Sequence, residues 1–296
     1  MVEADRVVQE VDGVLSGPPR TAYTASNSAI HNAEIARRQG FRGGVVGGSR
    51  HLNTFGPIML ELWGPSCFER GGVSMYFEST VVTGEQVRGL ARRPAPGAAA
   101  TEAWIERAGA EEVLVGRGTL TYGDHSGAAL QRRNFRFSDP SGLRLLSRFR
   151  ADQPMVSEVS RLTAESQAEQ LKTGEVNEPL PMYVEASPWG GPIAAISRSF
   201  ELCLRPTNKY LLENVTDTTP MGGAVEVLYR EGPVFLDRDY RIGSKCLGVG
   251  QSPKTEYIGI DYSVEEESGK VVATARQIYR FLKAGSPLYP ELRAGA

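Results

Sequence analysis

Histidine and glycine are the residues whose placement suggests chemistry in this sequence. Only three histidines occur, and His31 precedes a glycine-rich stretch that contains Gly43-Gly44 and Gly47-Gly48. An imidazole with an ordinary pKa near ~6.5 gives or takes a proton at neutral pH. Backbone N–H groups at the start of a helix, where glycine permits close approach, stabilise negative charge on a ligand oxygen. His31 is therefore one candidate for proton transfer, the alternative being a histidine that caps a helix or packs in the core. The helix start at Gly47-Gly48 is a candidate for charge stabilisation, the alternative being glycines needed only for a tight turn or close packing.

The elements that would position these residues occur twice along the chain. Each copy has a glycine pair, a helical stretch and then about four strand-like runs, at a period of roughly 150 residues that indicates a tandem duplication. A short amphipathic helix at 155–172 opens the second copy. Pro57 predicts a kink or a split in the first long helix, because a mid-helix proline costs about 3 kcal/mol. The expected long helices are 49–63 and 194–204, and the expected strands are 73–82, 86–92, 102–107, 112–121, 224–229, 238–248, 255–264 and 270–282.

This repeat predicts an α+β fold in which two tandem antiparallel sheets each pack around their own central helix. The first domain spans 1–125, and the second, degenerate domain spans 155–296. Between them, residues 126–154 form a turn-rich, arginine-rich connector.

Composition narrows the class of protein. The chain has 296 residues, of which 41% are hydrophobic and 23% charged, and its net charge of −2 provides no positive field for a nucleic acid. The three cysteines show no Cys-x-x-Cys spacing and are expected to be buried thiols in a reducing compartment. The N-terminal residues contain no long apolar run. We therefore expect a cytoplasmic protein with no membrane segment, metal or cofactor.

The residues from Ile30-His31 through Gly40-Phe41 and Gly43-Gly44 to Gly47-Gly48 resemble the hydratase motif of the MaoC-like (R)-specific enoyl-CoA hydratases and dehydratases. This resemblance implies a double hot-dog fold and a hydratase or dehydratase, a carbon–oxygen lyase, acting on an enoyl or 3-hydroxyacyl thioester. It also implies an acyl-CoA or carrier-protein-bound substrate and a homodimer. His31 matches the catalytic histidine of the family, and Gly48, with Gly47 beside it, matches the donor to the thioester carbonyl.

The sequence departs from the family pattern near His31. Ser26 stands where the family has its catalytic aspartate, and Ser28-Ala29 replaces Asn-Pro. Ser26 and Asn27 are expected to hold a water or to bond His31, although neither is a base near pH 7. Arg42, with its neighbours Arg37, Arg38 and Arg50, is a candidate for coenzyme A phosphates, the alternative being a solvated helix face. Candidate substitutes for the missing carboxylate are Tyr23, His51, Glu61, Asp124 and His125.

The second copy lacks both candidate groups. Tyr183 aligns with His31, and Ala194-Ala195 aligns with Gly47-Gly48. We therefore expect a single site in the first copy, with the second copy as its opposite wall. Two other functions remain open: a repurposed isomerase or cyclase acting on a specialised metabolite, and a non-catalytic partner of an active hot-dog subunit.

Overall fold

The structure, a computed structural model, describes residues 8–109 and 113–292. Residues 1–7, which carry the expectation about the N-terminus, and Glu112, the expected first residue of a strand, lie outside the described residues.

The first half supplies seven strands and the first central helix. Its elements are β1 Gln9–Val11, β2 Val14–Ser16, β3 Arg20–Thr21, the 3-10 turn η1 Ala29–His31, α1 Ala33–Arg38, the 3-10 helix η2 Gly48–Phe55, α2 Gly56–Trp63, α3 Cys67–Arg70, β4 Gly71–Phe77, β5 Gln86–Arg92, β6 Ala100–Ala108 and β7 Val113–Tyr122.

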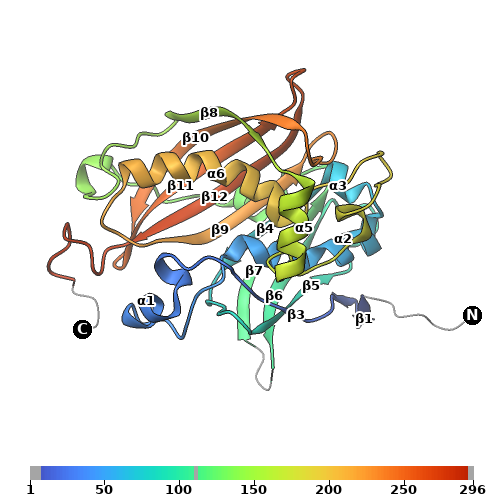
Figure 1. Ribbon diagram of the computed structural model, residues 1–296, viewed down its shortest axis with the longest axis horizontal. Coiled ribbons are helices and arrows are strands. Elements are labelled where there is room, and N and C mark those ends of the chain that lie inside the picture. The colour runs from blue at the N-terminus through green and yellow to red at the C-terminus, as the bar shows by residue number, and fades with distance from the viewer. Residues whose placement is uncertain (1–7, 110–112, 293–296) are drawn as a thin grey trace, which may run out of the picture.

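The second half repeats this order with a longer helix. Its elements, after the connecting α4 Ala129–Arg132 and η3 Pro140–Gly142, are β8 Pro154–Arg161, α5 Ala164–Thr173, η4 Pro181–Tyr183, α6 Ile196–Asn214, β9 Pro220–Tyr229, β10 Asp239–Gln251, β11 Thr255–Glu265 and β12 Val271–Leu282. Figure 1 shows α6 lying across the strands of this half.

The strands form one continuous antiparallel sheet, where the sequence led us to expect two. Its order is β1-β2-β5-β6-β7-β4-β9-β12-β11-β10-β8, with β3 paired to β5. The two halves join where β4 pairs with β9, from Gly72 opposite Leu228 to Tyr76 opposite Ala224. An unpaired strand edge leaves backbone N–H and C=O groups without partners, so the two inner edges pair with each other.

The central helices pack on one side of this sheet, and their boundaries agree in part with those expected from the sequence. Pro57 splits the first helix as expected: η2 ends at Phe55, and the proline occupies the first turn of α2, where its missing N–H costs nothing. The second helix continues ten residues past the expected end, through Pro206. Pro206, Thr207 and Leu211 are buried, and this tertiary packing offsets the local cost of the proline.

The expected helix at 155–172 is wrong in its first part. Residues Pro154–Arg161 form β8, and the helix α5 begins at Ala164 behind the cap Thr163. The segment contains the apolar residues Met155 and Val156, whereas Val159 is exposed. It forms an edge strand that pairs with β10. The expectation that the three cysteines are buried thiols is confirmed, because all three are free and buried.

Asn53 joins the two central helices directly. Its amide Nδ2 donates to Ser197 Oγ over 2.9 Å, and its Oδ1 accepts the Ser197 backbone N–H over 2.9 Å. Asn53 is fully buried. Truncation of the Asn53 side chain would leave the buried Ser197 N–H without an acceptor.

Replacing Asn53 by Ala should therefore lower the free energy of unfolding by about 2 kcal/mol. Denaturant unfolding measures this loss. The control Asn134→Ala removes an exposed amide and should stay within about 0.5 kcal/mol of the wild type. Equal stability of the two variants would show that the link between the helices contributes nothing.

Candidate functional site

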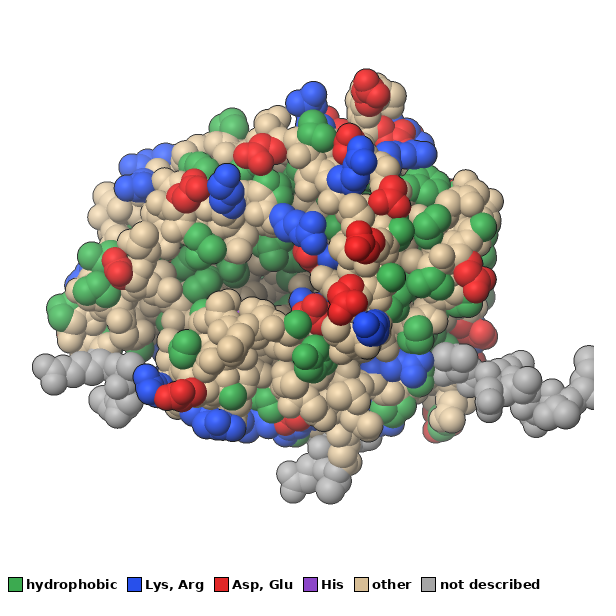
Figure 2. Space-filling model, viewed as in Figure 1, with side chains coloured by type: hydrophobic (Ala, Val, Ile, Leu, Met, Phe, Trp, Pro, Cys, Tyr) green, Lys and Arg blue, Asp and Glu red, His purple; other side chains and the backbone are tan. Residues whose placement is uncertain are grey.

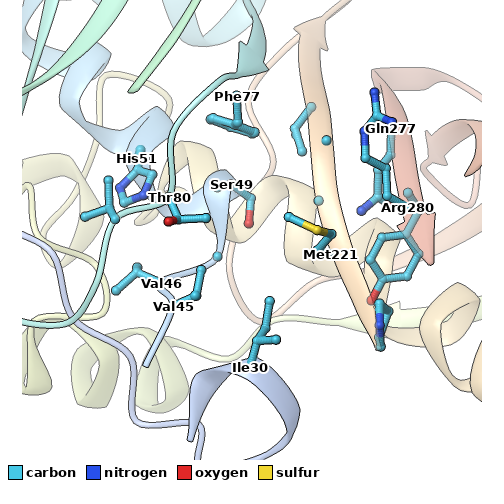
Figure 3. Close-up of a pocket in the computed structure, with 18 of the residues that line it drawn as sticks. Ile30, Val45, Val46, Ser49, His51, Phe77, Thr80, Met221, Gln277 and Arg280 are labelled. Carbon is cyan, nitrogen blue, oxygen red and sulfur yellow. The ribbon is translucent and has the colours of Figure 1, made fainter. Parts of the chain in front are cut away.

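A cavity of about 340 Å³ lies between the two halves. The first half lines it with 30–31, 45–49, His51 and 77–81, and the second half with Phe200, Leu204, 220–223, Val225, Gln277 and 279–280. Figure 2 shows a hollow over β9, below α6, on this face of the molecule. Figure 3 shows side chains of both halves around the cavity. The second half thus forms the opposite wall, as the sequence predicted.

His31 enters the cavity from the last position of η1. Its Nδ1 donates to the Val45 carbonyl oxygen over 2.6 Å, because a carbonyl only accepts. In neutral His31 the lone pair then lies on Nε2, which makes no hydrogen bond within the described residues. Gly44 permits this arrangement, since a Cβ there would lie 2.4 Å from the His31 carbonyl oxygen. The His31 ring is therefore held through Nδ1, and Nε2 is left without a partner within the described residues.

The glycine turn begins the first central helix at the cavity wall. Gly47 caps η2, and both Gly47 and Gly48 line the cavity. The backbone N–H groups of Gly48 and Ser49 have no acceptor within the part of the chain that the structure describes. A Cβ on Gly48 would lie 2.3 Å from the Phe77 ring. Glycine at 48 is thus required for packing, and it leaves unpaired donors beside the cavity.

Three other residues expected in the site do not line the cavity. Ser26 is exposed, and its Oγ lies 3.2 Å from Ser28 Oγ. Asn27 Oδ1 accepts from the Asn32 side chain over 2.7 Å. Arg42 donates to Glu85 and, over 2.8 Å, to the Thr80 carbonyl oxygen. The structure therefore brings His31 together with the glycine turn and places Ser26, Asn27 and Arg42 outside.

No free carboxylate replaces the missing aspartate within the described residues. Glu78 is the acidic side chain among those that line the cavity, and it is paired with Arg117 at 2.5 Å. Among the five candidate substitutes, only His51 lines the cavity. His125 instead contacts Thr121 Oγ1 through Nδ1 at 2.8 Å and donates from Nε2 to the Tyr229 carbonyl oxygen.

His51 is an almost completely buried imidazole in the cavity wall, with 2% of its surface exposed. Its ring meets the Phe77 ring edge to face, with centroids 6.4 Å apart. Nδ1 has no hydrogen-bond partner within the described residues. Burial, reinforced by the charge of Arg50, lowers the pKa of His51 to about 4, so the ring is neutral at pH 7.

The sequence did not reveal Arg280, Gln277 or Tyr279 as cavity residues. They lie on β12, far along the chain from His31, and only the β4–β9 junction brings them to the first half. The one signal available was the glycine pair Gly222-Gly223, which also lines the cavity.

The second half has a closely matching local structure, with a shifted register. The Val45 N–H donates to the Ile30 carbonyl oxygen, just as the Ile193 N–H donates to that of Met182. This equivalence aligns Tyr183 with His31, as expected. It also aligns the helix caps Gly47 and Ala195, and therefore Gly48 with Ile196. The pairing of Gly47-Gly48 with Ala194-Ala195 is wrong by one residue. It follows from aligning Gly43-Gly44 with Gly190-Gly191, and these two pairs are themselves offset by one residue from the equivalence of Val45 with Ile193.

The equivalent space in the second half is filled. Tyr229 ends β9 as Phe77 ends β4, and its hydroxyl lies 3.1 Å from Ser199 Oγ. The Tyr183 ring packs edge to face on Phe68, with centroids 6.0 Å apart. All three aromatic rings are buried, and burial raises the pKa of Tyr183 and of Tyr229. Tyr183 therefore takes the place of the imidazole and supplies packing.

We predict that Gly48→Ala lowers the free energy of unfolding by about 1–3 kcal/mol, because the Phe77 ring must move. Gly47→Ala is the matched control: its Cβ meets nothing within 4 Å, and its φ of −60° suits alanine. Denaturant unfolding of both variants measures the difference. A loss as large in Gly47→Ala as in Gly48→Ala would refute the packing explanation.

His51 should make stability depend on pH in a definable window. Its pKa of about 4 in the folded chain lies below the ordinary 6.5, so the unfolded chain binds this proton first as pH falls. Proton binding by His51 in the unfolded chain does not affect stability above pH 6.5, and it should destabilise the wild type by about 3 kcal/mol at pH 4. His51→Gln removes it. Between pH 7 and pH 4, the unfolding free energy of the wild type should therefore fall by about 3 kcal/mol more than that of His51→Gln. Parallel curves for the two proteins would contradict the assignment.

Two negative observations apply to the described residues. None of their helices has the length and apolar character needed to span a bilayer. No group of three or more His, Cys, Asp or Glu side chains among them is arranged to hold a metal ion.

Comparison with known proteins shows likeness in structure. No family model matches the sequence, and no curated protein matches it. A MaoC-like dehydratase is 14% identical, with a TM-score of 0.50, over 84% of this chain and 88% of that one. A MaoC domain protein dehydratase from Chloroflexus aurantiacus J-10-fl is 11% identical, with a TM-score of 0.57, over 93% and 94%. A conserved protein from Mycobacterium tuberculosis with a double hotdog fold is 10% identical, with a TM-score of 0.56, over 90% and 94%. At these identities the likeness establishes the fold, and the chain has the double hot-dog architecture.

Proposed function

We propose that this chain is a hydratase or dehydratase acting on an enoyl or 3-hydroxyacyl thioester, carried by coenzyme A or by a carrier protein. The observation that supports it is one cavity lined by both His31 and the start of the first central helix, in a fold like that of MaoC-like dehydratases. A cytoplasmic location, a homodimer and the lack of a cofactor belong to the same proposal.

Each residue has a defined role in hydration. His31 Nε2 takes a proton from water while the water oxygen bonds to Cβ of the enoyl group. The electron pair of the double bond moves toward the thioester oxygen, where the N–H groups at Gly48 stabilise the enolate. The imidazolium then returns its proton to Cα, so the net reaction adds one water. Dehydration is the reverse sequence.

The Val45 carbonyl matters in each step. By accepting from Nδ1 over 2.6 Å, it fixes the ring and stabilises the imidazolium that forms. A carbonyl carries no full charge, so it stabilises the cation less than a carboxylate would. A missing acid or base costs ~10²–10⁴-fold, and we expect slow turnover compared with an enzyme that has both groups.

The missing catalytic carboxylate also favours a second candidate function. An isomerase or cyclase acting on a specialised metabolite needs a base and a carbonyl donor and adds no water. No unpaired carboxylate lines the cavity within the described residues, which is the observation in its favour. A non-catalytic partner of an active hot-dog subunit would use neither group.

Loss of enoyl absorbance with a short and a medium trans-2-enoyl-CoA tests the proposal. The wild type should turn over at least one of them, and His31→Ala should lose about 10²-fold or more. The control Tyr183→Phe alters the equivalent residue of the second half, whose hydroxyl has no partner within the described residues, and should keep full activity.

Two results would count against the proposal in different ways. No turnover of either thioester by the wild type removes hydration and favours the isomerase or the non-catalytic partner. Turnover that persists in His31→Ala leaves a hydratase but removes His31 from the mechanism.

A further inference from the structure

A second hollow adjoins the cavity and contains basic side chains. It measures about 720 Å³ and shares Phe77, Glu78 and Arg280 with the cavity. Tyr76, Glu102, Arg117 and Arg133 also line it. We call this hollow the arginine groove. Arg280 is therefore a side chain that the cavity and the groove have in common.

Arg280 is a guanidinium with no acidic partner within the described residues. It lies over the Tyr257 ring, 5.4 Å from the centroid, and its Nη1 donates to Thr255 Oγ1 over 3.3 Å. Glycine at 223 leaves room for the Arg280 side chain, because a Cβ added there would lie 2.5 Å from Arg280 Nε. Partial burial lowers the pKa of Arg280, and nearby Arg133 lowers it further. The cation is thus partly desolvated and repelled by a second cation.

Arg133 is also free of carboxylate contacts within the described residues. Its guanidinium lies over the Tyr76 ring, 4.1 Å from the centroid, and its side chain is exposed. The Tyr76 hydroxyl has no hydrogen-bond partner in the same part of the chain. The Tyr76 hydroxyl therefore adds a polar group without a partner at the Arg133 end of the groove.

The acidic side chains of the groove are already engaged. Glu78 pairs with Arg117 at 2.5 Å, and Glu102 pairs with Arg92 at 3.0 Å. Three of the four arginines first considered for phosphate contacts are in a similar position: Arg38, Arg42 and Arg50 pair with Glu34, Glu85 and Glu175. An anion at those arginines must displace a carboxylate, whereas one between Arg133 and Arg280 displaces none.

We propose that Arg280 and Arg133 bind an anionic oxygen group, a phosphate or a carboxylate, of the ligand whose acyl part occupies the cavity. The inference rests on the proposed function only in naming that ligand as an acyl thioester. A phosphate would belong to the carrier end of the thioester, and a carboxylate would belong to its acyl chain. Guanidinium groups suit both, because their paired N–H donors match two oxygens.

Equilibrium binding by calorimetry tests this without turnover. The probes are coenzyme A, pantetheine, which lacks phosphate, and glutarate, which carries two carboxylates. Arg280→Gln and Arg133→Gln should each weaken the binding of an anionic probe by roughly 10-fold or more, from the loss of a charged hydrogen bond. Arg280→Lys keeps the charge and should retain part of the affinity. Arg132→Gln, on the same segment but outside the groove lining, is the matched control and should match the wild type.

The probes separate the two sources of the anion. Arginine-dependent binding of coenzyme A, with weak binding of pantetheine, indicates a phosphate. Arginine-dependent binding of glutarate indicates a carboxylate. Binding of both anions that is equal in the wild type and in the two glutamine variants, or binding of neither to the wild type, would overturn the proposal.

These results are independent of the hydratase assay. Turnover that depends on His31, combined with anion binding that does not depend on Arg280 or Arg133, keeps the proposed function and removes the anion site. Arginine-dependent anion binding without turnover of either enoyl thioester does the reverse.

Discussion

The antiparallel pairing of β4 with β9 is the contact on which the rest of the molecule depends. It turns two half-sheets, each with an exposed inner edge, into one continuous sheet. The pairing stops at Tyr76 opposite Ala224. Beyond that point, Phe77 and Glu78 in one half and 220–223 in the other are no longer hydrogen-bonded to each other and line the cavity. The same junction therefore closes the fold and leaves the space in which a ligand can bind.

The two ends of this junction have diverged. At one end, small residues and an imidazole leave the space open: Gly44 accommodates His31, and Gly48 accommodates Phe77. At the other end, Tyr183 and Tyr229 fill it. A duplicated fold offers two equivalent places for a site, and in this chain packing occupies one of them. The remaining place draws side chains from both halves, which explains why β12, with Arg280, faces His31 across the cavity.

Much of this architecture is readable from the sequence, and the exceptions have physical causes. Alternating runs located the strands, and Gly56-Pro57 located the break in the first helix, because both signals are local. The second helix runs past its expected end at 204 and through Pro206, since burial of α6 on the sheet outweighs a local penalty. The edge strand β8 looked helical because Met155, Val156, Val159 and Leu162 recur at the three- and four-residue spacing of an amphipathic helix. Whether two sheets fuse, and whether Arg280 reaches the cavity, depends on pairing between distant strands, which periodicity does not encode. Ser26 lies near His31 in the sequence and Arg42 lies near the glycine turn, but both satisfy their hydrogen bonds elsewhere.

The central proposal is that one chain binds one acyl thioester, at His31. Nitrogen NMR of the three histidines during titration with a saturated acyl-CoA, which cannot be hydrated, tests it most directly. The account predicts that the ligand-free protein has the His31 proton on Nδ1. On titration, the Nε2 signal of His31 should shift and saturate at one ligand per chain, while the signals of His125 stay unchanged. Two ligands per chain, or saturation that leaves the His31 signals unmoved, would contradict it.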